Sequence, residues 1–146
     1  MSKAPPKTTR AEVAETLHRS VLRLLRRLRK VDDDLGLSTA RLSALSVLVF
    51  VGPQSVGSLA EIEQVSQPTM TSLTQRLIRG GYVRVELDPK DRRIKRLIAT
   101  AKGKKLLERG RRNRLELLSS MLEALPDADV QLLSRSAATI ESLLGP

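Results

Sequence analysis

The stretch that decides the fold runs from Ser55 to Thr100 and reads SVGSLAEIEQVSQPTMTSLTQRLIRGGYVRVELDPKDRRIKRLIAT. It predicts two short helices joined by a tight turn, followed by a two-stranded hairpin with a basic tip. Ser55 and Ser66 can each cap a helix, because a serine hydroxyl accepts a bond from an amide that the first helical turn leaves unpaired. The connection at 63–65 has the length that a helix-turn-helix needs. This order of elements predicts a winged helix-turn-helix.

The second helix of the pair has one apolar and one polar face. Pro68 suits its first turn, where a missing N–H costs nothing, and Gly80 and Gly81 suit a left-handed C-cap. Met70 and Leu77, with Leu73 between them, form an apolar stripe at about 100° per residue. The remaining surface offers hydroxyls, amides, guanidinium groups and a proline ring, without an acid: Gln67, Pro68, Thr69, Thr71, Ser72, Gln75, Arg76 and Arg79. Such groups bond to base edges in the major groove, although alone they would also suit a solvated surface helix.

The helix before it supports the DNA-binding interpretation. Leu59, Ala60 and Ile62 are its candidates for burial, and Val65 is apolar where the turn would fold onto the core. Gln64 stands where a glycine often eases such a turn. A glutamine can occupy this position at modest strain, so the prediction of a helix-turn-helix stands.

The hairpin supplies the third part of the unit. Residues 82–87 form the expected first strand, the cluster 88–91 is rich in turn-forming residues, and residues 97–99 return as the second strand. The tip is basic, with Lys90, Arg92 and Arg93 at its end and Lys95 and Arg96 behind them. A like-charged tip is costly unless it meets an anion, and a slender basic tip fits the minor groove of DNA. A merely soluble loop is the plainer alternative.

The combination of these motifs resembles the MarR family of bacterial transcriptional regulators. The resemblance rests on Val65–Thr71, Arg76-Leu77, Gly81–Val83, Asp88–Arg93 and Thr100–Gly103. The order of elements matches over nearly the whole chain, whereas the specific motifs lie within residues 55–103. Ser72 stands where such proteins often carry Arg, and Ala99 where they often carry Leu. The first departure removes a long cationic side chain and the second loosens local packing.

We therefore expect a sequence-specific DNA-binding regulator, and more narrowly a repressor, that acts as a homodimer on a pseudo-palindromic operator. Two copies of helix 67–79 would enter successive major grooves about 10 base pairs apart. The wings, led by Arg93, would reach the adjacent minor grooves. The resemblance also implies a pocket for a small-molecule effector between the dimer helices and the DNA-binding lobe. His18 and its neighbours are candidates to line that pocket.

Composition limits the other classes of function. The chain has 146 residues, a formal net charge of +10 and a pI of about 10.8, which favours a polyanionic partner. With no cysteine and one histidine, it offers no disulfide, no thiolate nucleophile and no transition-metal site. We expect no catalytic residues, no cofactor and no metal. It also lacks a secretion signal and an apolar stretch of about 20 residues, so we expect a cytoplasmic protein.

The flanking segments predict a tail and dimerisation helices. Residues 1–8 are expected to be a disordered tail, 38–100 the DNA-binding domain, and 9–35 and 101–146 dimerisation helices. The first half of helix 101–124 has too few apolar residues to be buried, and we expect it to be a strut. A last helix opens at Pro126 with Asp127 as its cap. The terminal helices carry apolar surface that one subunit cannot bury, which is typical of an interface, with these candidate contacts: Val13, Leu17, Leu132, Leu133, Ile140 and Leu144.

Two other classes remain open on the sequence. The net charge alone would also suit a nonspecific nucleic-acid-coating basic protein, which a palindromic footprint would exclude. The basic helix 9–35 could lie on a membrane surface, which predicts vesicle binding in competition with DNA. A globular pattern follows that helix, so we expect no membrane partner.

Overall fold

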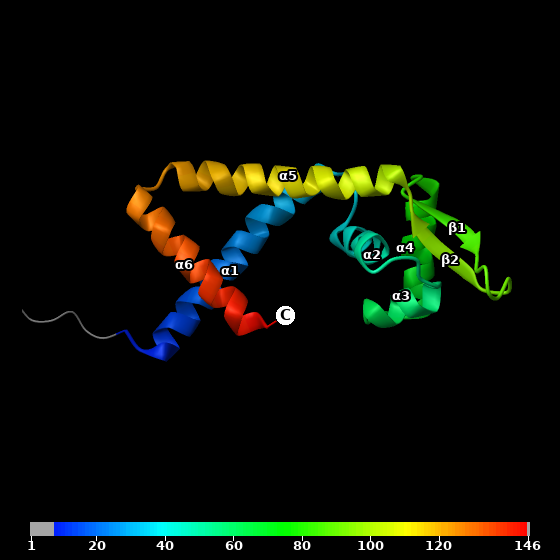
Figure 1. The fold of residues 1–146 in the computed structure, drawn as a ribbon, viewed down its shortest axis with the longest axis horizontal. Helices are drawn as coiled ribbons and strands as arrows, with labels where there is room; N and C mark the ends of the chain where they lie inside the picture. Colours follow the sequence, from blue (N-terminus) through cyan, green and yellow to red (C-terminus); the bar gives the residue numbers. More distant parts are fainter. Residues whose placement is uncertain (1–7, 146) are drawn as a thin grey trace, which may run out of the picture. The chain divides into compact units, whose positions relative to one another are not determined.

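The structure is a computed structural model that describes residues 8–145, so the expected tail at 1–8 lies outside the described residues except for Thr8. The predicted class is confirmed: the fold is mainly α-helical with one antiparallel hairpin (Figure 1). The described chain divides into two compact units on either side of Gly110. The elements are α1 (Arg10–Asp33), α2 (Thr39–Phe50), α3 (Val56–Ile62), α4 (Gln67–Arg79), β1 (Val83–Leu87), β2 (Lys95–Ala99), α5 (Ala101–Glu123) and α6 (Asp127–Leu144).

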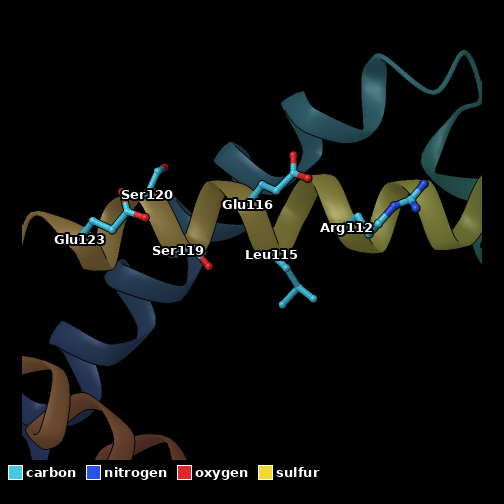
Figure 2. A pocket seen from close by; sticks show the side chains of 6 residues that line it. All are labelled: Arg112, Leu115, Glu116, Ser119, Ser120 and Glu123. Atoms are coloured by element: carbon cyan, nitrogen blue, oxygen red, sulfur yellow. The ribbon is translucent and has the colours of Figure 1, made fainter.

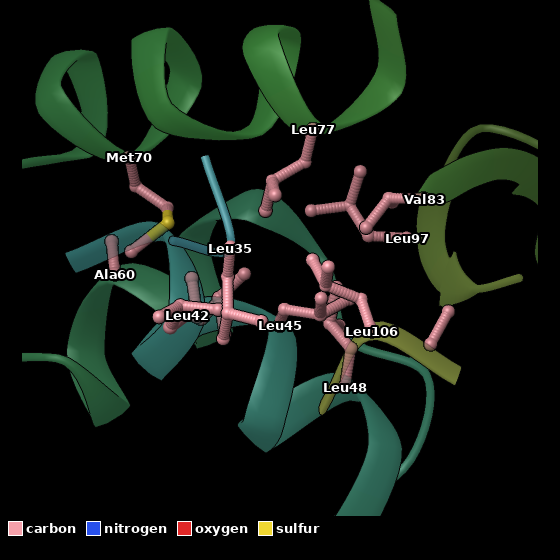
Figure 3. Close-up of a cluster of buried hydrophobic side chains, with 13 residues drawn as sticks. Leu35, Leu42, Leu45, Leu48, Ala60, Met70, Leu77, Val83, Leu97 and Leu106 are labelled. Atoms are coloured by element: carbon pink, nitrogen blue, oxygen red, sulfur yellow. The ribbon is translucent and has the colours of Figure 1, made fainter. Parts of the chain in front are cut away.

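The core of the first unit is aliphatic. Figure 3 shows Met70 and Leu77 of α4 pointing from one side into a cluster that contains Leu45 of α2 and Val83 of β1. All four of these side chains are almost completely buried. Because the apolar stripe of α4 is used in this way, its opposite face is left on the surface.

The hairpin has a fixed register that runs from Val83 opposite Ala99 to Leu87 opposite Lys95. Gln54 adds a single antiparallel bridge to Leu97, with N···O distances of 3.2 and 2.7 Å in the two directions. This bridge ties the segment before α3 to β2, and the sequence patterns did not reveal it. The hairpin is therefore attached to the helices along its base as well as through the chain.

Local capping explains where several helices begin. Thr9 and Glu12 form a reciprocal capping box at α1, and the bond from the Thr9 amide lowers the pKa of Glu12. The hydroxyls of Ser55 and Ser66 accept bonds from amides at the starts of α3 and α4, as predicted. The hydroxyl of Thr100 does the same at the start of α5.

The start of α6 differs from its prediction. Asp127 is the first residue of the helix rather than its cap, Pro126 occupies the N-cap position, and no side chain caps this end. The carboxylate of Asp127 still lies in the first turn, where the helix dipole favours a negative charge.

Two expectations about burial near α3 were wrong. Ile62 and Val65 are exposed, because the buried side of α3 lies toward Leu59 and Ala60, and Ile62 falls about 60° beyond Leu59 at 100° per residue. Val65 contributes its backbone instead, donating its N–H to Ala60 O at 3.0 Å.

The first half of α5 is packed rather than free of the core. Gly103, Leu106 and Gly110 are buried there. A Cβ on Gly103 would lie 2.4 Å from Tyr82 O. The expectation of an unburied strut failed because small residues let a helix approach closely without supplying apolar side chains.

The apolar stripes of α1 and α6 remain open in the single chain. No residue of either helix is buried. The exposed fraction is 53% for Val13 and 58% for Leu132. The apolar side chains of α6 are half-buried at best: Val130, Leu132, Leu133, Ala137, Ile140, Leu143 and Leu144. Within residues 8–145, no helix has the length and apolarity that a membrane crossing requires.

Candidate nucleic-acid interface

Helix α4 presents the polar face that its sequence predicts. Seven of the eight candidate residues are exposed, namely Gln67, Pro68, Thr69, Ser72, Gln75, Arg76 and Arg79. The eighth, Thr71, is half-buried. At about 100° per residue, the centre of this face lies opposite Met70. The face is therefore open to a partner along its whole length.

Two hydroxyl groups of this face already have partners within the protein. Thr71 Oγ1 donates to Gln67 O at 2.9 Å, and Thr69 Oγ1 lies 2.8 Å from Ser66 Oγ. These hydroxyls strengthen the first turn of α4. The long polar side chains of the face are then the amides of Gln67 and Gln75 and the guanidinium groups of Arg76 and Arg79. Arg and Gln side chains of this kind make bidentate contacts to guanine and adenine.

Thr74 was missed as a buried residue. Its exposed fraction is 2%, and its hydroxyl donates to Met70 O at 2.9 Å. This bond satisfies the polar group within the helix, so Thr74 can pack as if it were apolar. The sequence spacing could have predicted this burial, because Thr74 follows Met70 by four residues and precedes Leu77 by three.

The turn between α3 and α4 has the geometry of a Schellman motif. Gln64 has a φ of 54°, in the left-handed region, as expected from its place in the turn. Its N–H donates to Glu61 O at 3.2 Å, and the next N–H donates to Ala60 O at 3.0 Å. These two bonds satisfy carbonyls that the end of α3 would otherwise leave unpaired. The turn thereby fixes how α4 leaves α3.

A buried carboxylate organises the base of the wing. Asp88 is 4% exposed, and its Oδ1 accepts bonds from the N–H groups of Lys90 at 2.7 Å and Asp91 at 3.2 Å. Its Oδ2 accepts a bond from Arg96 Nε. The Lys90 amide, the Arg96 guanidinium and the Asp91 amide, in that order of effect, lower the pKa of Asp88. The carboxylate is therefore held in its ionised form.

Arg96 belongs to this support rather than to the tip. Besides Asp88, it donates from Nη1 to Pro53 O at 3.3 Å. The sequence placed Arg96 behind the tip but gave no sign that Asp88 would hold it. Their eight-residue separation becomes a contact only when the register of the hairpin is known.

The tip is less uniformly cationic than expected, because Asp91 lies within it and is paired with Arg93. Arg93 Nε lies 3.3 Å from Asp91 Oδ1, which also accepts the Arg93 N–H at 3.0 Å. The Arg93 side chain is nevertheless 93% exposed. The remaining candidates Lys90 and Arg92 are exposed on the loop, and Lys95 is exposed as the first residue of β2.

Two hollows lie on helices outside this interface. One has a volume of about 340 Å³ and lies along α5. Its lining residues include Arg112, Leu115 and Glu123 (Figure 2). The other, of about 370 Å³, is lined on α1 by residues that include His18 and Arg26. Each is lined by a single helix, so each is an open face rather than an enclosed cavity.

Comparisons with known proteins identify the family of this chain. The family model described as "MarR family" matches residues 35–94. An uncharacterised HTH-type transcriptional regulator of Mycobacterium leprae is 34% identical over 130 residues, which cover 89% of this chain and 90% of that protein. In fold, the chain is similar to a transcriptional regulator of Thermotoga maritima, with a TM-score of 0.81, 24% identity, and coverage of 92% and 95%.

A further solved structure contains DNA. It is a mutant of Staphylococcus aureus MepR bound to an oligodeoxyribonucleotide, with a TM-score of 0.72, 17% identity, and coverage of 95% of this chain and 100% of that one. At this identity the likeness shows the fold alone, whereas the mycobacterial relative shows the family. This chain therefore belongs to the MarR family, and it is a transcriptional regulator with a DNA-binding winged helix-turn-helix.

Proposed function

We propose that the protein is a repressor that binds a pseudo-palindromic operator as a homodimer. The observation that carries this proposal is the open, acid-free polar face of α4 beside an exposed basic wing. Gln75 and Arg76 would contact base edges or nearby phosphates in the major groove. Arg93 would enter the adjacent minor groove, where the narrow width and negative potential attract arginine.

The homodimer is proposed from the exposed apolar stripes of α1 and α6. Val13 and Leu17 lie on the first helix, and the candidate contacts of the second are Leu132, Leu133, Ile140 and Leu144. An apolar stripe of this kind left open to water usually marks an interface. A two-fold dimer would cover it and would present two copies of α4 to one duplex. Residues 9–35 and 101–146 would then be the dimerisation helices, and 38–100 the DNA-binding domain.

Repression would follow from occlusion of a promoter by the bound dimer. A small molecule that changes the spacing of the two wings would release it, as the family resemblance implies. Chromosomal DNA as the target would place the protein in the cytoplasm.

Footprinting tests the proposal directly. The protein should protect a two-fold symmetric site in the DNA that flanks its own gene, with half-sites about 10 base pairs apart centre to centre. The alternative, a nonspecific nucleic-acid-coating protein, is favoured only by the net charge of +10. Uniform protection of unrelated duplexes at the same protein concentration would support that alternative and would contradict a repressor.

Two variants separate base contacts from phosphate contacts. Gln75→Ala should cost about 1–3 kcal/mol on the operator and less on random DNA. Arg93→Ala should weaken binding to both and lower the slope of log K against log salt by about 0.9. Equal losses for Gln75→Ala on both duplexes, or an unchanged salt slope for Arg93→Ala, would refute the respective roles.

A further inference from the structure

The C-terminal end of α4, the helix proposed to enter the major groove, contacts a cation of α5. Lys102, in the first turn of α5, donates from Nζ to Gly80 O at 2.7 Å. Gly80 is the C-cap of α4, where carbonyls lack helical partners and the helix dipole is negative. The same Nζ lies 4.8 Å from the centroid of the Tyr82 ring, which is a cation–π distance.

Hydrogen bonds also hold the backbone at the junction between the end of α4 and the start of α5. Thr100 donates from Oγ1 to Gly81 O at 2.7 Å and from its N–H to Tyr82 O at 3.0 Å. Gly103 packs against the Tyr82 carbonyl so tightly that a Cβ has no room. The end of α4 and the start of α5 therefore form one rigid joint.

A second cation on α5 makes the equivalent contact with another helix. Arg109 donates from Nη2 to Asp34 O at 3.3 Å, and Asp34 is the C-cap of α1. Arg109 follows Lys102 by two helical turns, so the two side chains lie about 20° apart around the axis of α5. One edge of α5 thus holds the carbonyl ends of both α4 and α1.

We propose that Lys102 and Arg109 are positioning residues for DNA binding. Together they fix the direction of the recognition helix relative to α1 through α5. Their side chains are directed to protein carbonyls, so neither acts as a contact to DNA phosphate. The inference rests on the proposed function, because a loosely held α4 would lose affinity only for a site that requires a defined geometry.

The test compares Lys102→Met and Arg109→Met with two matched controls in the full-length protein. Lys104 lies about 160° around α5 from Lys102, and Arg111 about 160° from Arg109, so Lys104→Met and Arg111→Met remove the same charges from the opposite side of the helix. Affinity for a fluorescent operator duplex and for a random duplex is measured across a salt series. We expect each positioning variant to weaken operator binding about three- to tenfold with an unchanged salt slope, and the controls to retain the wild-type preference for the operator.

A spectroscopic readout keeps the test decisive if the variants bind poorly. Tyr82 is the only tyrosine, and the chain has no tryptophan, so its emission reports on the joint. Lys102→Met should change that emission, Lys104→Met should not, and Lys102→Arg should restore both the emission and much of the affinity, since a guanidinium also donates to a carbonyl and stacks on an aromatic ring.

Two results would overturn the inference. A salt slope that falls by about 0.9 in Lys102→Met would identify Lys102 as a phosphate contact. Wild-type operator affinity in both positioning variants would remove their role altogether. If the wild-type protein itself selects no symmetric site, the proposed function fails, and with it the DNA-positioning role, even where the Tyr82 emission behaves as expected.

Discussion

At the residue scale, Gln64 sits in a conformation that a side chain adopts at a cost. Its φ of 54° is left-handed, which costs a non-glycine residue about 1–2 kcal/mol. The substitution Gln64→Gly removes that strain. It also gives the unfolded chain more conformational freedom, which lowers the free energy of unfolding by about 0.4–1 kcal/mol. We therefore predict a net gain in the free energy of unfolding of up to about 1 kcal/mol, measured by urea denaturation.

Gly81, at the end of α4, is the control for this prediction, because a glycine already occupies the left-handed position there. Its φ is 72°, and a Cβ there would meet nothing closer than Lys102 Cδ at 3.8 Å. Gly81→Ala should lose about 1 kcal/mol through backbone strain alone. A loss of stability in Gln64→Gly as well would show that the turn does not store the strain assigned to it.

The buried carboxylate of the wing gives a prediction for acid pH. The pKa of Asp88 is lowered from 3.8, so its stabilising effect is complete above about pH 4 and is lost as the pH falls through the lowered value. Asp88→Asn should melt at a lower temperature than the wild type at pH 7. The difference should shrink as the pH falls below about 4 toward the lowered pKa, because protonation of the carboxyl then increasingly favours the unfolded wild-type chain. Thermal unfolding followed by circular dichroism measures both.

An exposed carboxylate on α6 serves as the control for this series. Glu141→Gln should change the melting temperature little at either pH, because surface charges usually contribute little to stability. If the difference in melting temperature between Asp88→Asn and the wild type stays constant from pH 7 to pH 2, that result would contradict the role of the ionised Asp88.

At the scale of elements, the start of α5 depends on the absence of a side chain. A Cβ on Gly103 would lie 2.4 Å from Tyr82 O and 3.0 Å from Leu45 Cδ1, whereas one on Gly57 of α3 would meet nothing within 3.8 Å. Gly103→Ala should destabilise the protein by about 1–3 kcal/mol. Gly57→Ala should gain about 0.5–1 kcal/mol, because alanine favours a helix. Denaturant melts that move in the same direction for both variants would refute this packing.

The same elements show which features of the fold can be predicted from the sequence. Serine caps, the glycines that end α4 and the apolar stripe of α4 act within one turn of helix, so neighbouring residues are enough to predict them. The burial of Gly103 and the exposure of Ile62 depend on which face a distant element covers. The contact between Asp88 and Arg96 depends on the register of the hairpin. None of these can be deduced from spacing along one segment.

At the scale of the whole molecule, dimer formation should depend on the open stripe of α6. Leu133→Asp would place a charge in the proposed interface and should weaken the dimer by about 2 kcal/mol or more. Sedimentation at micromolar concentration should then detect monomer. Gln131→Asp introduces the same charge outside the candidate contacts and should leave the mass unchanged. A wild-type protein that sediments as a monomer and still binds its operator tightly would contradict the dimer.

The exposed wing also has a consequence for proteolysis. Lys90, Arg92 and Arg93 lie on an exposed loop, and trypsin cleaves after lysine and arginine in such loops. If the wing enters a groove of DNA, the bound duplex shields those peptide bonds. The rate at which trypsin nicks the hairpin then reports how much of the regulator is occupied, without any label on either molecule.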